Sequence, residues 1–336
     1  MQAIPFVRSS AVLPFVTLLN QVGAPTEQLL QKANLPPCIL DDPENLVPLN
    51  QGFSFAELAA RAEGIDNIGI LVGQQTNLSH LGNFGTVVSQ SLTLHDLIRK
   101  IVQFHNTFVT GEKIWFTKEN DYVWLHHQYT VPQHIETYQA QCFSVMVYLN
   151  VIYLSGDLHW QPDYLDLRSN KSKVFLELIG LSQAQTKFNQ PSNAFRFPKA
   201  LLSQPIIHLS NASSNPTSME ESFKSTAPAT QFKDSLYQLI QILLPQGDPS
   251  LRFAAEAAGI SVRTFQRRLE NNNLNYSQLV EQVRFDQAVK LLQDPTNQLI
   301  DVAFDLGYSD AANFTRAFKR WTGISPREFR RLHLQK

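Results

Sequence analysis

The sequence predicts an α+β domain, then a flexible linker, then an all-α domain with two helix-turn-helix units joined by a long helix. Three observations support this fold class. The first two thirds of the chain mix helical and strand periodicity, residues 209–230 are rich in Ser, Thr, Asn and Pro, and the last hundred residues carry only helical patterns. We therefore divide the chain into residues 1–208, 209–230 and 231–336.

The first domain is predicted to begin with helices and to continue with strands. Apolar periodicity between Gly and Pro signals indicates helices near residues 11–21, 26–33 and 53–63. A glycine-marked turn is expected at Leu81–Gly85, followed by a helix at residues 94–108. The other predicted elements are a hairpin at 113–117 and 122–130, a helix at 133–154, strands at 158–160 and 194–197, and a helix at 173–180.

The second helix-turn-helix unit is clearest at residues 299–330. An apolar helical run ends at Gly307, the residue type that closes a helix in the left-handed conformation without a steric penalty. Ser309 or Asp310 can then cap the next helix. The inward face of that helix carries aromatic residues at helical spacing, Phe314, Phe318 and Trp321.

Residues 250–270 repeat this arrangement. An alanine stands four residues before Gly259, and Phe265 and Leu269 occupy the inward face of the following helix. Between the two units, residues 277–292 predict a helix whose apolar residues point in most directions, so it must be buried on more than one side. Such a rod, about 22 Å long, can hold two helices at a spacing compatible with successive major-groove turns about 34 Å apart.

The outward faces of the two second helices are rich in cations and in short side chains. A small residue such as Ala312 lets the backbone approach base edges, while an arginine such as Arg316 can reach a guanine or a phosphate. These faces predict binding to double-stranded DNA. The candidate DNA-contacting residues are Arg263, Thr264, Gln266, Arg267, Ala312, Asn313, Thr315, Arg316, Lys319 and Arg320.

Two motifs in the helical region resemble a known family. The series G-Y-S-D-x-x-x-F-x-R-x-F-K at 307–319 and the series G-I-S-P-x-x-F-R at 323–330 are similar to the DNA-binding domain of the AraC/XylS family of bacterial transcription regulators. The resemblance covers about the last quarter of the chain. It implies that both reading helices enter the major groove on one face of the DNA, and that the chain regulates transcription, with activation as the family's more frequent mode.

The upstream region resembles the arabinose-binding-type regulatory domain found in the same family. The matching motifs are L-G-x-x-G at 81–85, S-x-T-L at 91–94 and N-x-F-x-F-P-x-x-L-L-x-x-P at 193–205. The region lacks the H-x-H clusters and the short strands expected of the family's other partner domain, a cupin barrel. The name of the domain does not fix its ligand.

The charge distribution agrees with a nucleic-acid partner for the last domain only. The whole chain has a net charge of -1. Residues 248–336 hold 13 Lys and Arg against 10 Asp and Glu, a net +3, whereas the remainder holds 15 against 19, a net -4. The small surplus predicts modest nonspecific affinity, with the favourable electrostatics concentrated on two helix faces.

The first domain is predicted to bind a small-molecule effector and to form a homodimer, so that occupancy controls the DNA-binding domain. RNA polymerase is considered as a further partner. Aromatic and polar residues near the hairpin and the helix that follows it are the candidate effector contacts. They are Trp115, Trp124, His127, Tyr138, Gln141 and Met146.

Two other functions stay open: a ligand-independent dimeric DNA-binding regulator, and an enzyme with a DNA-tethering tail. We expect no enzyme and no cofactor, because no nucleophile elbow, phosphate loop or dinucleotide fingerprint is present. No metal site is expected, because His126 and His127 are neighbours on a strand and point to opposite sides. Cys38 and Cys142 are predicted to be reduced core residues. No apolar run reaches membrane-spanning length, so we expect a cytoplasmic protein without a membrane partner.

Overall fold

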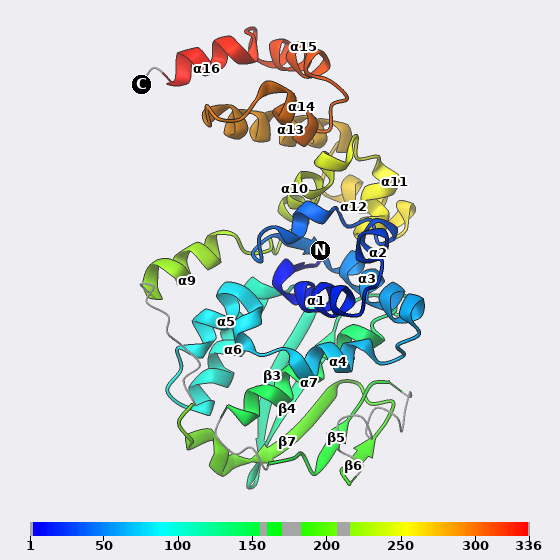
Figure 1. The fold of residues 1–336 in the computed structure, drawn as a ribbon, viewed down its shortest axis with the longest axis vertical. Coiled ribbons are helices and arrows are strands. Elements are labelled where there is room, and N and C mark those ends of the chain that lie inside the picture. Colours follow the sequence, from blue (N-terminus) through cyan, green and yellow to red (C-terminus); the bar gives the residue numbers. More distant parts are fainter. Residues whose placement is uncertain (1–2, 155–159, 170–182, 207–215, 335–336) are drawn as a thin grey trace. The chain divides into compact units, whose positions relative to one another are not determined.

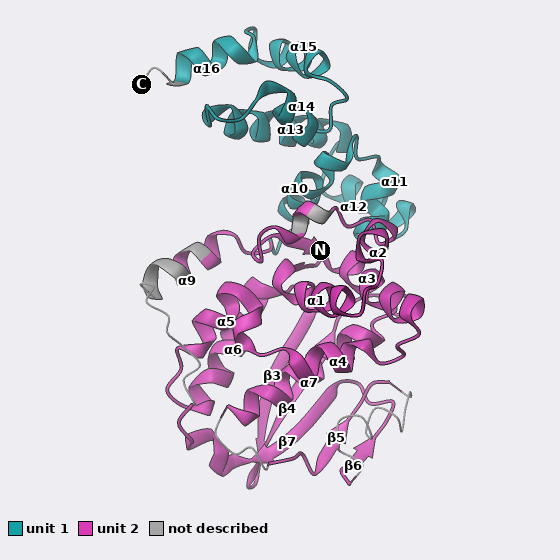
Figure 2. Ribbon diagram, in the orientation of Figure 1, with its two compact units in different colours: residues 1–4, 229–336 teal, residues 5–228 magenta. Residues whose placement is uncertain are grey.

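The computed structural model describes residues 3–154, 160–169, 183–206 and 216–334. The chain forms two compact units, which Figure 2 shows in different colours. Pro5–Pro228 form the first, here called the mixed unit, and Met1–Ile4 together with Ala229–Lys336 form the second, the helical unit. The predicted helix at 173–180 lies outside the described residues, as does most of the predicted strand at 158–160.

The mixed unit combines short helices with two sheets (Figure 1). Its described α-helices are α1 (Leu13–Gln21), α2 (Thr26–Lys32), α3 (Leu49–Glu63), α4 (Ile68–Gln75), α5 (Gly82–Ser89), α6 (Leu94–Phe108), α7 (Tyr138–Tyr153) and α9 (Pro216–Ser225). Its strands are β1 (Phe6–Arg8), β2 (Leu46–Pro48), β3 (Glu112–Glu119), β4 (Tyr122–Tyr129), β5 (Tyr164–Asp166), β6 (Gln185–Lys187) and β7 (Asn193–Pro198). Short 3₁₀ helices are η1 (Ser9–Ala11), η2 (Pro37–Leu40), η3 (Leu78–Leu81) and η4 (Lys199–Ser203).

The larger sheet has the strand order β3-β4-β7-β5-β6, and a separate two-stranded sheet pairs β1 with β2. Neighbouring strands of the larger sheet are antiparallel except β5 and β6, which are parallel. The predicted hairpin is confirmed, with Lys113 opposite Gln128. Burial alternates along β4, so that Val123, Leu125 and every second residue after them face the interior. This alternation decides which side chains of the hairpin can reach the core.

Helix α7 is buried around most of its circumference because α4 packs closely against it. Two glycines of α4 permit this approach: a Cβ added at Gly69 would lie 2.0 Å from the Gln139 carbonyl oxygen, and one added at Gly73 would lie 2.5 Å from Met146 Cβ. The predicted apolar helix is therefore confirmed over Tyr138–Tyr153, with its start later than the sequence suggested. The preceding residues form no helix.

The predicted turn at Leu81–Gly85 is wrong, because most of this segment belongs to helix α5. Gly82 adopts a left-handed backbone, with φ of 59°, at the junction with η3. Gly85 lies within the helix, where an added Cβ would come 1.6 Å from the carbonyl oxygen of Leu78. The second glycine of the motif thus permits close packing of two helical segments rather than a reversal of the chain.

The predicted linker at 209–230 differs from the structure in its second half, where α9 packs on the mixed unit. Phe223 of α9 is fully buried, and its carbonyl oxygen accepts a hydrogen bond of 2.9 Å from Arg8 Nη2. Arg8 is itself buried, with its guanidinium 4.4 Å from the centre of the Phe223 ring. A single apolar anchor in a polar stretch is too weak a periodic signal to predict this helix from the sequence.

The helical unit contains α10 (Phe232–Leu243), η5 (Leu244–Gln246), α11 (Leu251–Ala257), α12 (Val262–Asn271), α13 (Tyr276–Gln293), α14 (Leu299–Asp305), α15 (Ala311–Thr322) and α16 (Pro326–Leu334). The prediction of two helix-turn-helix units joined by a long helix is confirmed. Helix α13 buries Val280, Val283 and Ala288, among others, against its neighbours.

Residue Ile4 also belongs to this unit, and its backbone N-H donates to Ser235 Oγ at 2.9 Å. Among the described helices, none has the length and hydropathy needed to cross a membrane.

Candidate nucleic-acid interface and effector cavity

The two helix-turn-helix units close their first helix in the same way. Gly259 and Gly307 have φ of 69° and 77°, and each follows the last turn of α11 or α14. In both units the next backbone N-H bonds back across the turn, from Ile260 to Ala255 at 3.0 Å and from Tyr308 to Ala303 at 2.9 Å. These bonds satisfy helix carbonyls that would otherwise lack partners. The equivalence confirms the internal repeat seen in the sequence.

Each second helix begins at a side-chain cap. Ser261 Oγ accepts the N-H of Thr264 at 3.2 Å at the start of α12, and Asp310 Oδ1 accepts the N-H of Asn313 at 2.6 Å at the start of α15. Asp310 is therefore the cap of α15, one of the two candidates from the sequence. The capped starts fix the rotation of both helices, and Phe265 and Phe314 are fully buried as predicted.

The candidate DNA contacts lie on the opposite faces of these helices. On α12, Arg263, Gln266 and Arg267 are exposed and Thr264 is half-buried. On α15 the exposed candidates are Ala312, Arg316, Lys319 and Arg320, and the half-buried ones are Asn313 and Thr315. Within the part of the chain that the structure describes, no carboxylate lies within ion-pair distance of the Arg263, Arg267 or Lys319 side chains.

Four candidates on α15 already have hydrogen-bond partners, namely Asn313, Thr315, Arg316 and Arg320. Arg320 Nη2 donates to Glu281 Oε1 of α13 at 2.7 Å, and Trp321 Nε1 donates to the same oxygen at 2.7 Å. The hydrogen bond from Trp321, followed by that from Arg320, lowers the pKa of the Glu281 carboxyl. The Thr315 hydroxyl donates to the carbonyl oxygen of Ala311 at 2.7 Å, within its own helix. Arg316 Nη2 donates to Asn313 Oδ1 at 2.5 Å, and the Asn313 amide donates to Asp310 Oδ2 at 2.7 Å. Arg320 must therefore give up a contact with another helix to bind a ligand, whereas the contact of Arg316 lies within its own helix.

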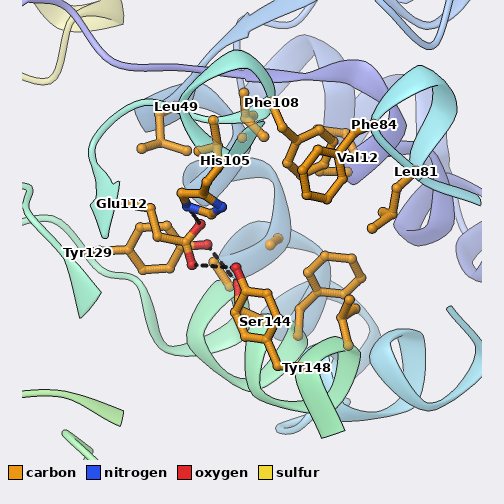
Figure 3. Close-up of a pocket in the computed structure, with 18 of the residues that line it drawn as sticks. Val12, Leu49, Leu81, Phe84, His105, Phe108, Glu112, Tyr129, Ser144 and Tyr148 are labelled. Carbon is orange, nitrogen blue, oxygen red and sulfur yellow. Dashed lines mark hydrogen bonds and ion pairs between the residues drawn. The ribbon is translucent and has the colours of Figure 1, made fainter. Parts of the chain in front are cut away.

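The mixed unit encloses a cavity of about 70 Å³ (Figure 3). Helices α3, α5, α6 and α7 and strands β3 and β4 contribute to its walls. Most of the lining is aliphatic or aromatic, including Phe15, Phe53, Phe84, Phe108 and Phe143. The rings of Phe84 and Phe108 are stacked, with 4.6 Å between their centroids.

One end of the cavity is polar. His105 of α6, Glu112 of β3, and Tyr129, Ser144 and Tyr148 line it, and Figure 3 shows their polar groups directed toward one another. Tyr129 Oη lies 3.0 Å from Ser144 Oγ, and Tyr148 Oη donates to Glu112 Oε1 at 3.4 Å. The lining of the cavity is therefore mostly apolar, and its polar side chains are gathered at one end.

Glu112 is the charged centre of this polar end. His127 Nε2 lies 2.6 Å from its Oε1 atom and His105 Nε2 lies 3.4 Å from its Oε2 atom. Burial by itself raises the pKa of Glu112, but the charges of His127 and His105 outweigh burial, and the pKa falls to about 2. The carboxylate is ionised in the folded protein at neutral pH. No three His, Cys, Asp or Glu side chains among the described residues are placed to hold a metal ion.

The six residues selected as effector contacts are not brought together around this cavity. Trp115 and Trp124 lie on the other face of the sheet, where the Trp115 ring stacks on His126 at 5.0 Å and Trp124 Nε1 donates to Glu119. Met146 is buried where α7 meets α4. The three others are placed as follows: His127 contacts Glu112, Tyr138 donates to Asn67, and Gln141 accepts from Asn193. His126 and His127 face opposite sides of the sheet, as predicted.

Sequence reasoning missed His105, Glu112 and Tyr148 as lining residues. A partial signal was present for Glu112, which stands directly before the strand predicted at 113–117 and two residues before the inward-facing Ile114, so that it shares the face of Ile114 once the strand is extended by one residue. The histidine lies on the buried face of the helix predicted at 94–108, where a titratable residue is uncommon. No local pattern connects these residues to Tyr148 of α7.

The fold and the exposed cationic helices define a DNA-binding transcription regulator with a separate regulatory unit. Family models match both parts: residues 254–332 match the helix-turn-helix domain, and residues 23–206 match the N-terminal arabinose-binding domain of AraC transcription regulators. The chain belongs to the AraC family of transcription regulators that carry this N-terminal domain.

Two relatives match nearly the whole chain, and a third matches about its last quarter. The ornithine utilization regulator of Pseudomonas aeruginosa is 23% identical and is matched over 98% of this chain and 96% of its own length. The regulator VirS of Mycobacterium tuberculosis is 23% identical over 96% of each chain. VqsM of P. aeruginosa is 39% identical over 28% of this chain and 30% of its own. The crystal structure of the regulator CdpR from P. aeruginosa aligns over 91% of this chain and 96% of its own, with 20% identity and a TM-score of 0.38.

Proposed function

We propose that a small-molecule effector in the cavity of the mixed unit controls DNA binding by the helical unit. The observation that carries this proposal is the position of Phe84. Its ring forms part of the cavity wall and also packs at 6.3 Å, between centroids, from Phe223 of α9. Helix α9 is followed shortly by Pro228, where the chain leaves the mixed unit. A ligand that shifts Phe84 would thus act on the segment leading to the DNA-binding helices.

We assign to Arg8 the role of holding that segment against the rest of the mixed unit. Its guanidinium donates to the carbonyl oxygens of Thr107 and Phe223, each at 2.9 Å, and to Thr226 Oγ1 at 3.2 Å. Thr107 precedes Phe108, whose ring lines the cavity. One buried side chain therefore joins the cavity wall to the last turn of α9 and to the residue just after it. An effector can change DNA affinity only if it binds two arrangements of the protein unequally, and release or docking of α9 supplies two such arrangements.

The control route is tested by Arg8→Met in the full chain. We expect DNA affinity, on an operator selected from random sequences, to change by at least fivefold relative to wild type, and amide hydrogens of residues 216–226 to exchange faster. Arg99→Met is the control, because Arg99 is exposed on the same unit. Faster exchange in α9 with unchanged DNA affinity would reject this route.

On the DNA side, we propose that α12 and α15 occupy successive major grooves, with Arg267 and Arg316 as the principal contacts. Arg267→Ala or Arg316→Ala should cost about 1 to 3 kcal/mol on the selected operator if the side chain is bidentate to a guanine, and should relax preference at one base. Equal weakening on every sequence would instead identify a phosphate contact. Arg99→Ala again serves as the charge-matched control.

We further infer that the chain acts as a homodimer and as an activator that contacts RNA polymerase. On this proposal the chain binds DNA and an effector and catalyses no reaction. Its relatives are transcription regulators. Analytical ultracentrifugation tests the dimer, and transcription from the selected operator in a purified system tests activation.

The alternative function is that of a regulator whose DNA binding does not depend on a ligand. It would gain support if no compound in a broad metabolite panel changed DNA affinity.

A further inference from the structure

The lining of the cavity is poorly suited to a sugar, even though the matching domain is named for arabinose. A pentose presents several hydroxyl groups, and each one loses hydrogen bonds with water when it is buried. The described wall instead consists largely of Phe, Leu, Val and Ala side chains, with polar atoms gathered at one end. An occupant that matches this surface must be mostly apolar, with a polar group at one end.

His105 marks where that polar group would lie. The side chain is buried, with 3% of its surface exposed, and it lines the cavity (Figure 3). Among the described residues, neither of its ring nitrogens has a hydrogen-bond partner. Its Nε2 atom lies 3.4 Å from Glu112 Oε2 without forming a hydrogen bond, so Nδ1 is the nitrogen that has neither a hydrogen bond nor an ion-pair contact there. Buried polar atoms in folded proteins nearly always have a partner, which a ligand can provide.

The charges at this end limit what the ligand head can be. Glu112 already contacts both His105 and His127, so its negative charge is compensated within the protein. A ligand carboxylate would face Glu112 in a poorly solvated site, and a ligand ammonium would compete with two histidines for one carboxylate. An uncharged hydroxyl avoids both costs, because it can donate to an imidazole nitrogen and accept from a nearby donor.

We propose that the cavity binds a small, uncharged, largely apolar molecule that carries one hydroxyl group, of which phenol is the simplest example, with the hydroxyl against His105. The apolar body would lie between the aromatic side chains, where Phe84 and Phe108 already form a stacked pair. The cavity volume of about 70 Å³ restricts the occupant to about one ring, admitted by small outward movements of the wall. This proposal rests on the same cavity as the proposed effector control.

The test is direct binding to the full chain, measured by calorimetry and by thermal shift. The probes are phenol, toluene, benzoate, benzylamine and L-arabinose, which vary the head group around one ring and add the sugar. We expect phenol to bind at least tenfold more tightly than toluene, and the two charged compounds and the sugar to bind more weakly than toluene. Tighter binding of benzoate, benzylamine or arabinose than of phenol would overturn the proposal, as would the absence of phenol binding.

A variant locates the hydroxyl. His105→Phe keeps a ring in the wall but removes the nitrogen, so phenol should lose its advantage over toluene while toluene binding stays within threefold of wild type. His95→Phe is the matched control, since His95 lies exposed on the same helix α6. If His105→Phe still binds phenol more tightly than toluene, the hydroxyl does not lie against His105, and this part of the proposal is overturned. Should His105→Phe fail to fold, the comparison of the five probes on the wild-type chain still decides the ligand class.

Failure of this inference can be told apart from failure of the proposed control. Phenol that binds as described but leaves operator affinity unchanged would support the ligand class and reject the control by that ligand. A response of operator affinity to arabinose, without any binding of phenol, would support the control and reject the ligand class.

Discussion

In the interior of the mixed unit, the Nε2 atom of His127 lies 2.6 Å from Oε1 of Glu112, and both side chains are about 3% exposed. Strand β4 supplies the histidine and strand β3 the carboxylate, from inward positions of the hairpin. A second histidine, His105, reaches the other carboxylate oxygen. The hairpin, helix α6 and the cavity are therefore connected through one buried carboxylate.

Glu112→Gln should destabilise the mixed unit by about 3 kcal/mol at pH 6, because it removes the buried carboxylate that His127 and His105 both contact. The pKa of Glu112 is about 2 in the folded chain against an ordinary 4.5. A lowered pKa stabilises the fold above about pH 4.5, and this stabilisation disappears as the pH falls towards 2. Urea unfolding from pH 2.5 to pH 6, followed by tryptophan fluorescence, measures it. A wild-type advantage that does not shrink at low pH would contradict the assignment.

Gly307→Ala should lower both thermal stability and operator affinity. The substitution strains a left-handed backbone, and its Cβ would also lie 2.5 Å from the carbonyl oxygen of Gly247 and 2.6 Å from that of Leu244. Gly323→Ala is the control, because Gly323 has nearly the same φ, 78°, with open space around the added atom. We expect about 1 to 2 kcal/mol for Gly323→Ala, from backbone strain alone, and a clearly larger loss for Gly307→Ala. Equal losses would show that the close approach is unimportant.

Lys319→Ala should weaken DNA binding across all sequences and reduce the slope of log affinity against log salt by about 1. Arg320→Ala should do less, because Arg320 is already paired with Glu281 at 2.7 Å and must give up that contact to bind a phosphate. Titrations at several salt concentrations compare the two. A larger effect of Arg320→Ala would mean that the Glu281 pair opens readily on DNA.

Gly52→Ala should stabilise the mixed unit by about 0.5 to 1 kcal/mol. Gly52 lies in α3 on the cavity wall, and an added Cβ would meet the methyl groups of Val47, Val7 and Val12 at 3.8 to 3.9 Å, an ordinary packing distance. Gly73→Ala should be destabilising, since the same atom there would lie 2.5 Å from Met146 Cβ. Thermal melting of both variants checks the contrast, and stabilisation by Gly73→Ala would show that α4 and α7 can separate at little cost.

The two cysteines should differ in reactivity. Burial raises the pKa of the Cys142 thiol to about 12, which leaves almost no thiolate at pH 8. Cys38 is exposed, so the expectation that both are core residues is wrong for Cys38. A thiol reagent at pH 8 should modify Cys38 in the folded chain and Cys142 only after denaturation. Rapid modification of native Cys142, followed by mass spectrometry, would contradict its burial.

The helical unit could be predicted from the sequence because its signals are local. Gly307 ends a helix, Asp310 begins the next, and the Phe314 and Phe318 rings set which face is buried, all within a dozen residues. Which exposed residues touch DNA stays a prediction, since the sequence gives the face and not the contacts.

The cavity could not be predicted, because its parts come from distant segments and depend on strand register. Trp115 and Glu112 belong to the same strand, yet an odd spacing places them on opposite faces of the sheet. Choosing aromatic residues by type therefore selected Trp115 and Trp124 on the face away from the cavity. Helix α9 was missed for a related reason, since its anchor Phe223 contacts Arg8 and Phe84, which both lie far upstream in the sequence.

The chain passes between its two units twice, once after Ile4 and once after Pro228. A protease that cuts only near Pro228 would consequently leave the larger fragment still holding Ile4, whose N-H is bonded to Ser235 of the smaller one. The two pieces should co-purify until this short tail is also removed. A truncated protein that starts at Ala229 would lack a native hydrogen bond of its first helix, and restoring the tail as an added peptide or by circular permutation is the more faithful way to isolate that half.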